Sequence, residues 1–335
     1  MRANQDIMDK PRAECMIAGE NGRRGRNSMT DGIAAERPAP VGGGAPADTR
    51  RNYLVGVAMA LVGSSFLSIA GVIMRHVEQA DGWQMLFWRS IVFSGAILLW
   101  LLVRYGARLP QAFMAIGRLG LLIAVVMGTS FIGYLLALAW TPVASAMVVM
   151  SSGPMFAAVF GLVILKETVR LRTWIAIAVA TVGLIATVTE GLGVGSVAGI
   201  VAAFVAIITF VLMIVLMRGG RAIDMLPAAC LAGLFAASVA ATQVETFVLT
   251  PRDFGLAFVL GLVQNAGGFA LIALAAKRVP AAQMGLIGLV EPILAILWVW
   301  LLVDEAPGLL TLGGGVLVLA SVVFNTIGGM RRRSN

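Results

Sequence analysis

Residues 141–174 read TPVASAMVVMSSGPMFAAVFGLVILKETVRLRTW, and residues 279–305 read VPAAQMGLIGLVEPILAILWVWLLVDE. An offset of 138 aligns the two stretches without a gap and superposes rare residue types, namely Pro142 on Pro280, Pro154 on Pro292 and Glu167 on Glu305. Alanine and leucine matches carry little information in an apolar sequence, but matched prolines and glutamates do. The two stretches therefore indicate an internal duplication.

Outward from these stretches, long apolar runs alternate with short polar breaks from Tyr53 onward. Hydrophobic residues make up 59% of the 335 residues and charged residues 13%, with a mean hydropathy of +0.92. A soluble domain carries about a quarter charged residues, so lipid must solvate most of this chain. This excludes a soluble enzyme, a disordered regulator and a secreted disulfide scaffold.

A helix needs about 20 residues to cross the hydrocarbon core. The chain offers ten such runs, at 53–74, 84–103, 119–139, 143–165, 174–189, 197–217, 226–244, 254–276, 281–303 and 308–327. The runs are continuously apolar and lack the alternation of a β-barrel. We therefore expect an all-α integral membrane protein with ten transmembrane helices.

The duplication gives each copy five spans, at 53–189 and 190–328, before a basic C-terminus at 329–335. Five is odd, so the second copy must be inverted relative to the first. The loop charges agree with this inversion. The sequence after the fourth span, KETVRLR, has three basic residues, whereas the matching sequence after the ninth span, DEAPGLL, has none. Two inverted five-helix repeats are typical of secondary transporters, with the substrate site between the halves.

The first 52 residues hold nine basic and seven acidic residues without apolar periodicity, which predicts a disordered cytoplasmic tail. An alternative is that translation begins later, for instance at Met29. After the tail, thirteen Lys/Arg residues lie in one set of loops and only Arg75 and Arg252 in the other. This bias predicts cytoplasmic termini. The charge is spread over several loops, so no nucleic-acid partner is expected.

Several cofactor chemistries are excluded by composition. The only histidine is His76, and the cysteines are Cys15 in the tail and Cys230 in an apolar run. A multi-histidine metal site, a haem site and a structural disulfide are therefore not expected. The chain also lacks the G-x-x-x-x-G-K-[ST] pattern of ATP hydrolysis. We predict neither a cofactor nor a metal.

The stretch FWRS at 87–90, together with residues 141–174 and 279–305, resembles the drug/metabolite transporter superfamily, specifically its EamA type with two tandem repeats. The resemblance covers about residues 53–328. It implies a carrier of amino acids, their metabolites, vitamins, nucleoside-like solutes or dyes, mostly across the bacterial inner membrane, with export the commoner direction. The long tail departs from the family pattern, in which the first helix starts almost at once.

Two ionisable residues stand out within the spans, because each costs on the order of 3 kcal/mol at a helix centre. Glu291 lies in the middle of the ninth span, directly before Pro292. It is either a pathway carboxylate that contacts a cation or takes a proton, or a structural residue that bonds groups freed by the proline. Arg89 is either a clamp for a substrate carboxylate or for Glu291, or a side chain that snorkels to the outer interface.

Further polar candidates for the substrate pathway share a position within the spans, namely Gln264, Asn265, Ser151, Ser152, Tyr134, Gln283 and, near the outer boundary, Trp88. The amides and hydroxyls either bind a ligand or tie helices together, and interfacial anchoring is the alternative for Trp88. Helix breaks at Gly153–Pro154 and at Pro292 are expected to flank the site.

The leading hypothesis is a secondary transporter that exports small metabolites, such as amino acids or related compounds, by alternating access, with Glu291 offering a route for protons. An uptake carrier or facilitator for a vitamin- or nucleoside-like solute is the alternative. A membrane-embedded lipid-modifying enzyme is more remote, since the inner loops lack clustered acids and histidines. A channel would need a continuous polar lining. The expected partners are a small-molecule substrate, protons and the lipid bilayer; the sequence does not predict the oligomeric state.

Overall fold

All of the regular structure among the described residues is helical. The computed structural model describes residues 46–164, 171–194, 196–219, 224–279, 284 and 287–330. From Ala47 onward these residues form one compact unit.

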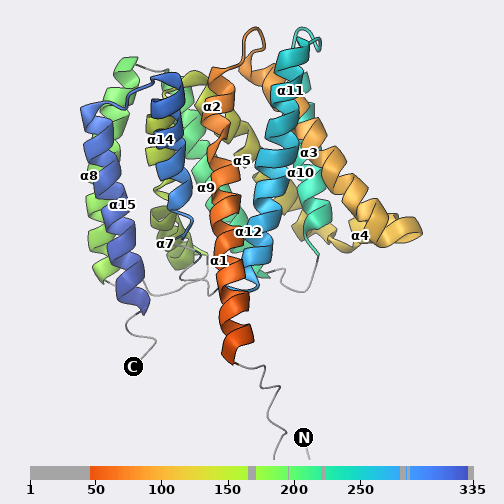
Figure 1. Ribbon diagram of the computed structural model, residues 1–335, viewed down its shortest axis with the longest axis horizontal. Coiled ribbons are helices and arrows are strands. Elements are labelled where there is room, and N and C mark those ends of the chain that lie inside the picture. The colour runs from red at the N-terminus through yellow and green to blue at the C-terminus, as the bar shows by residue number, and fades with distance from the viewer. Residues whose placement is uncertain are drawn as a thin grey trace, which may run out of the picture. The chain divides into compact units, whose positions relative to one another are not determined.

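The first half of the unit contains the helices of the first repeat (Figure 1). They are α1 (Pro46–Ser68), α2 (Ala70–Arg75), α3 (Gly82–Tyr105), the 3-10 helix η1 (Gly106–Arg108), α4 (Leu109–Ala115), α5 (Gly117–Trp140), α6 (Val143–Met150), α7 (Gly153–Val163) and α8 (Leu171–Val194). The second half contains α9 (Val197–Gly219), α10 (Leu226–Ala241), α11 (Pro251–Val259), the π-helix η2 (Leu260–Gly267), α12 (Gly268–Ala276), α14 (Val290–Val303) and α15 (Leu309–Met330).

The all-α membrane fold predicted from the sequence is confirmed. Seven helical segments of the described chain are long and apolar enough to cross a membrane, and they coincide with the first six predicted spans and the eighth. The seventh, ninth and tenth predicted spans correspond to the shorter apolar helices Leu226–Ala241, Val290–Val303 and Leu309–Phe324. The protein is therefore a multi-pass membrane protein.

The structure corrects the sequence prediction at three places. Helix α1 begins at Pro46, so residues 46–52 of the predicted disordered tail are helical; proline is well tolerated in the first turn of a helix. The first span is interrupted at Ile69. A short helix, α4, occupies a predicted loop and carries a proline in its first turn.

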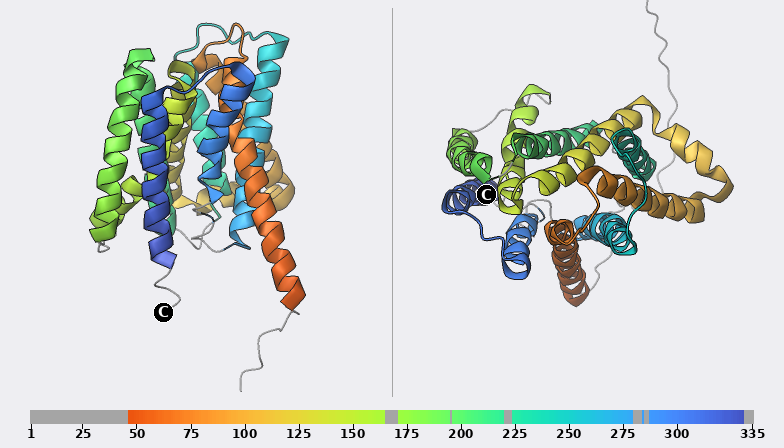
Figure 2. Two further views of the ribbon diagram at one scale, coloured as in Figure 1. Left: turned by 60° about the vertical axis from the view of Figure 1, so that its left-hand side comes forward. Right: turned by 90° about the horizontal axis from the view of Figure 1, so that it is seen from above.

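The two repeats interlock. The second helices of the two copies, α3 and α10, pack together, as do the fifth helices, α8 and α15 (Figures 1 and 2). Where α8 meets α15, a Cβ on Gly183 would collide with the carbonyl oxygen of Gly314, and a Cβ on Gly314 would collide with that of Gly183. The two backbones are in direct contact there, as small residues allow in membrane helix pairs.

Consecutive spans are antiparallel, so α9, the sixth, runs opposite to α1, the first (Figure 2). One end of the unit, here called the basic end, is where α1 begins and α15 ends. Its described basic residues include Arg51, Arg104, Arg108, Arg118, Lys277 and Arg278. The opposite end carries Arg75, the last residue of α2, and Arg252, in the first turn of α11.

Candidate functional site

A cavity of about 570 Å³ lies between the two repeats. Its size falls within the range of small-molecule sites. Both repeats contribute to its wall, which is mostly apolar and includes Leu67, Phe131, Met147, Met150, Ile207, Phe210 and Phe269. The cavity is therefore positioned where an inverted-repeat transporter binds its substrate.

The cavity extends toward the basic end. Its lining includes Ile214 and Val215 near the end of α9, and Met284 before α14. Toward the opposite end the lining includes Leu67, Arg89 and Ala206, each about two helical turns short of the end of its span, and Met147, about one turn from the start of α6.

Arg89 lines this cavity and is only 1% exposed. Its Nη2 donates to the Phe131 carbonyl at 3.3 Å, and its guanidinium lies 5.5 Å from the centre of the Phe131 ring. Its Nε has no hydrogen-bond partner. No acidic side chain among the described residues pairs with Arg89, so the predicted contact with Glu291 is absent in this conformation. Arg89 is thus a buried cation held by a carbonyl and a ring face.

The start of α3 explains how Arg89 is placed. Asp81 caps the helix: its carboxylate accepts from the Gln84 backbone at 2.7 Å, and the Gln84 side chain accepts from the Asp81 backbone at 2.9 Å. This reciprocal capping box fixes the first turn. Arg89 follows about two turns later.

Gln264 and Asn265 lie side by side in the chain on the π-helix η2 and both line the cavity. They are 2% and 3% exposed. Gln264 Nε2 donates to the Leu67 carbonyl at 3.3 Å, while Gln264 Oε1 and Asn265 Nδ2 have no partner. Such π-helical turns are frequent at functional sites.

Gly261 brings η2 against α3. A Cβ on Gly261 would lie 2.6 Å from the Arg89 carbonyl oxygen and 2.7 Å from the Val92 Cβ. Only a glycine permits this approach, which places the amides of η2 on the same side of the cavity as α3.

Glu291 lies in the first turn of α14, half-buried, and lines the cavity. It makes no hydrogen bond or ion pair with any described residue. The Tyr134 side chain also lines the cavity, and its hydroxyl lies 3.5 Å from the Leu67 carbonyl oxygen. Arg89, Tyr134 and Glu291 therefore share the wall of one cavity.

The helix break predicted at Gly153–Pro154 is visible as a turn at Ser151 and Ser152 between α6 and α7. The Ser151 hydroxyl donates to the Met147 carbonyl at 2.8 Å, and the Ser152 hydroxyl donates to the Val149 carbonyl. Ser151, Gly153 and Pro154 line the cavity, as does Pro292 in the first turn of α14.

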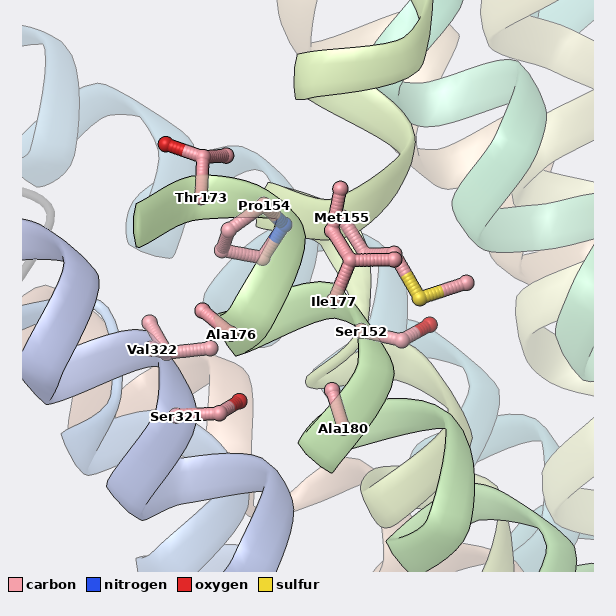
Figure 3. A pocket seen from close by; sticks show the side chains of 9 residues that line it. All are labelled: Ser152, Pro154, Met155, Thr173, Ala176, Ile177, Ala180, Ser321 and Val322. Carbon is pink, nitrogen blue, oxygen red and sulfur yellow. The ribbon is translucent and has the colours of Figure 1, made fainter. Parts of the chain in front are cut away.

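Ser152 points into a second, much smaller cavity of about 10 Å³, which has room for about one water molecule (Figure 3). This space lies where the helix break meets α8 and α15. Its other lining residues are Pro154, Met155, Thr173, Ala176, Ile177, Ala180, Ser321 and Val322. It is too small for a metabolite.

Besides Ser152, two predicted pathway residues are not part of the large cavity as described. Trp88 lies outside it: its indole nitrogen donates to the Phe247 carbonyl at 3.0 Å and its ring packs edge-on against Phe254. Trp88 thereby joins α3 to the segment before α11. Gln283 lies outside the described residues.

Sequence reasoning missed the aromatic part of the wall. Phe131 and Phe269 both line the cavity, with ring centroids 6.3 Å apart. The repeat offset superposes these two residues, so a matched aromatic pair was a usable signal.

At the opposite end of the unit lies a cluster that we call the latch: Arg75, Glu305, and the backbone of Leu138, Thr141 and Val143. Arg75 Nε donates to Glu305 Oε2 at 2.6 Å. Its two terminal nitrogens donate to the Leu138 and Thr141 carbonyls at 2.7 and 2.9 Å. Glu305 Oε1 also accepts from the Val143 backbone at 2.8 Å. The latch therefore joins the ends of α2, α5 and α14 to the start of α6.

A second fastening lies at the same end. The buried Asp253 carboxylate accepts from the backbone nitrogens of Glu78, Gln79 and Ala80 at 3.0–3.1 Å. Arg252 pairs with Glu78 beside it. The loop between α2 and α3 is thus tied to α11.

Two repeats of opposite orientation that pack against each other around a shared cavity define a membrane protein of the inverted-repeat transporter class. The sequence profile of the EamA-like transporter family matches residues 54–189 and 193–327. The chain belongs to this family, and it is accordingly a membrane transporter of the drug/metabolite transporter superfamily.

Comparison with solved structures agrees on the fold. One structure, described only as "Crystal structure of protein", is 19% identical with a TM-score of 0.55, and the match covers 84% of this chain and 98% of that one. A likeness at this identity shows the fold alone. None of the curated proteins compared with the chain matches it.

Proposed function

We propose that the protein is a secondary transporter that exports small metabolites, such as amino acids or related compounds, across the bacterial inner membrane by alternating access. The observation that carries this proposal is the cavity between the repeats, whose buried polar groups lack protein partners.

Five buried side-chain polar atoms in the described part of the chain have no hydrogen-bond partner, and three of them belong to Arg89, Gln264 and Asn265. Each such atom costs about 1–3 kcal/mol when it is left unsatisfied. Their convergence on one cavity supports a site in which a polar solute supplies the missing bonds.

Alternating access fits the two ends of the cavity. The latch fastens helices of both repeats at one end of the unit, and the cavity lining includes Ile214, Val215 and Met284 toward the basic end. Cytoplasmic termini, as the charge bias predicts, would make the basic end cytoplasmic. A solute would then enter the cavity from the cell interior, which is the direction of export, and leave after the latch opens.

Proton coupling would use Glu291. Its carboxylate lines the cavity without a hydrogen bond to any described residue, and burial disfavours the charged form of a carboxyl group. The charged and titratable described groups that face it across the cavity are Arg89 and Tyr134. Reversible protonation there would link solute movement to the proton gradient.

The test is counterflow in proteoliposomes that contain the purified full-length protein. Vesicles are loaded with unlabelled amino acids, nucleosides or vitamins, and entry of the labelled counterpart is followed. We expect saturable counterflow for a member of this panel, and loaded cells should release that solute faster when they express the protein. Linear, non-saturable entry would contradict a carrier, and net accumulation in cells would favour the uptake alternative.

Proton coupling is tested separately with Glu291→Gln. We expect this variant to lose the dependence of transport on an imposed pH gradient, while Glu245→Gln, an exposed carboxylate outside the helices, keeps it. Full pH-driven transport by Glu291→Gln would contradict the proton route.

A further inference from the structure

We infer that the cavity selects net-neutral solutes that carry one anionic and one cationic group on an apolar body, with Arg89 holding the anion and Glu291 the cation. This inference rests on the proposed transport function, because it assigns the substrate class of the same cavity.

The first step is the charge balance of the wall. Among the described lining residues, the side chains that carry full charges are one cation, Arg89 on α3, and one anion, Glu291 on α14. They form no ion pair with each other within 4 Å, and no other described charge neutralises either of them. Two opposite charges held apart across one cavity call for a solute with two opposite charges.

The second step is the anion site. Arg89 uses one nitrogen on the Phe131 carbonyl and lies against the ring of that residue, while its Nε is unpartnered. A guanidinium in this arrangement can bind a carboxylate through two nitrogens, the geometry in which arginine is strongest. Asn265 Nδ2 is a further unpartnered donor of the cavity wall.

The third step is the cation site. An ammonium group donates up to three hydrogen bonds and accepts none. The Glu291 carboxylate is a free acceptor, and Gln264 Oε1 is a buried acceptor without a partner in the same wall. The wall therefore offers unpartnered donors on Arg89 and Asn265 and acceptors on Glu291 and Gln264.

The fourth step is the body of the solute. Apart from the polar groups the wall is apolar and includes methionine and aromatic side chains, among them Met147, Met150, Phe210 and Phe269. Methionine adapts its shape to varied apolar groups. This wall favours an apolar side chain without fixing its outline.

Rejection follows from the same arrangement. A solute with only a carboxylate would leave Glu291 buried without a partner. A solute with only an ammonium group would leave Arg89 buried without a partner. A buried polar site discriminates strongly against an analogue that leaves its groups unpaired. Selectivity therefore depends both on the bonds made to the correct solute and on the cost of leaving Arg89 or Glu291 unpaired when a wrong solute binds.

The experiment compares three solutes of one shape: leucine, its carboxamide leucinamide, and its deaminated counterpart 4-methylpentanoate. Binding to the purified full-length protein is measured by calorimetry, and larger apolar amino acids are run alongside leucine. We expect the best zwitterion to bind at least about tenfold more tightly than either of its singly charged counterparts.

Two charge-removing variants give the sharper readout. Arg89→Gln should lose affinity for the zwitterion and the acid but not for the carboxamide. Glu291→Gln should lose affinity for the zwitterion and the carboxamide but not for the acid. Arg108→Gln and Glu245→Gln, at exposed positions outside the cavity, are the matched controls. Thermal unfolding of each variant shows whether it is folded.

Equal binding of the zwitterion and its singly charged counterparts would overturn the inference. So would a panel in which singly charged or uncharged solutes bind and no zwitterion does, or variants that weaken all three solutes alike. If one of these outcomes is found and the wild type still shows counterflow of some other solute, the selectivity inference fails but the proposed transport function remains. Absence of counterflow for every solute would instead remove the transport function.

Discussion

Arg75 and Glu305 lie 230 positions apart in the sequence and form an ion pair with 2.6 Å between Nε and Oε2. Each partner also bonds the chain around the turn between α5 and α6, so the pair fastens helices from both repeats at one end of the cavity. The proposed alternating-access cycle is expected to break this contact.

Glu305→Gln is expected to weaken the latch. The Glu305 carboxylate accepts hydrogen bonds from the Arg75 guanidinium and from a backbone nitrogen, and a neutral amide cannot replace both of these interactions. The probe is a cysteine introduced at Val299, which is buried beside Gly71 of α2. We expect its rate of labelling by an impermeant maleimide to rise about tenfold in Glu305→Gln. A tenfold rise corresponds to a loss of about 1.4 kcal/mol from the free energy that favours the closed conformation. The background is a chain in which Cys15 and Cys230 are both replaced by alanine.

Glu78→Gln is the matched control for the latch. It removes the exposed pairing with Arg252 at the same end and leaves Arg75 and Glu305 intact. An equal rise in labelling for both variants would mean that the latch does not hold this end closed.

Gly314→Ala is expected to destabilise the protein. Its Cβ would collide with the carbonyl oxygen of Gly183, and overpacking of a tight contact costs about 1–3 kcal/mol. Thermal unfolding in detergent should therefore shift to lower temperature. Gly313→Ala, one residue earlier, meets nothing within 4 Å and should unfold no earlier than the wild type.

Gly261→Ala is expected to disturb the site more than the fold. The added Cβ would push η2 away from the Arg89 carbonyl and displace Gln264 and Asn265. Small misplacements of positioning groups can cost about 10²-fold, so the affinity for the transported solute should fall at least tenfold. Gly255→Ala, which has open space around it, should bind normally, and comparable loss in both variants would refute the positioning role.

Asp253→Asn is expected to release the loop between α2 and α3. The carboxylate accepts three backbone hydrogen bonds, and hydrogen bonds to charged groups contribute about 1.5–3 kcal/mol. Amide exchange at Glu78, Gln79 and Ala80 should accelerate. The exposed Asp304→Asn should leave these amides unchanged, and protection that survived in Asp253→Asn would contradict the anchoring role.

The helices were predictable because continuous apolar runs of about 20 residues report membrane burial directly. The inverted repeat followed from matched prolines and glutamates, and the two ionisable residues that were singled out, Arg89 and Glu291, do line one cavity. A charge in lipid is costly enough that its position is informative by itself.

The remaining features depend on packing that a hydropathy pattern does not encode. The apolar run that contains Gln264 does not reveal a π-helical turn. The orientation of Trp88 toward Phe247 and Phe254 was not predictable either, because the rotation of a helix about its axis is set by the neighbouring helices. The latch joins residues far apart in sequence. Arg75 and Glu305 appeared in separate loops, with nothing local to pair them.

The central claim is tested most directly by counterflow of the zwitterionic solute in proteoliposomes that contain wild type, Arg89→Gln or Glu291→Gln. The account predicts saturable counterflow for the wild type and loss of at least about tenfold in each variant, given the cost of unpairing a buried charged group, with the Arg108→Gln and Glu245→Gln controls unaffected. Wild-type rates in both cavity variants, with the proteins folded, would show that the solute does not pass between Arg89 and Glu291.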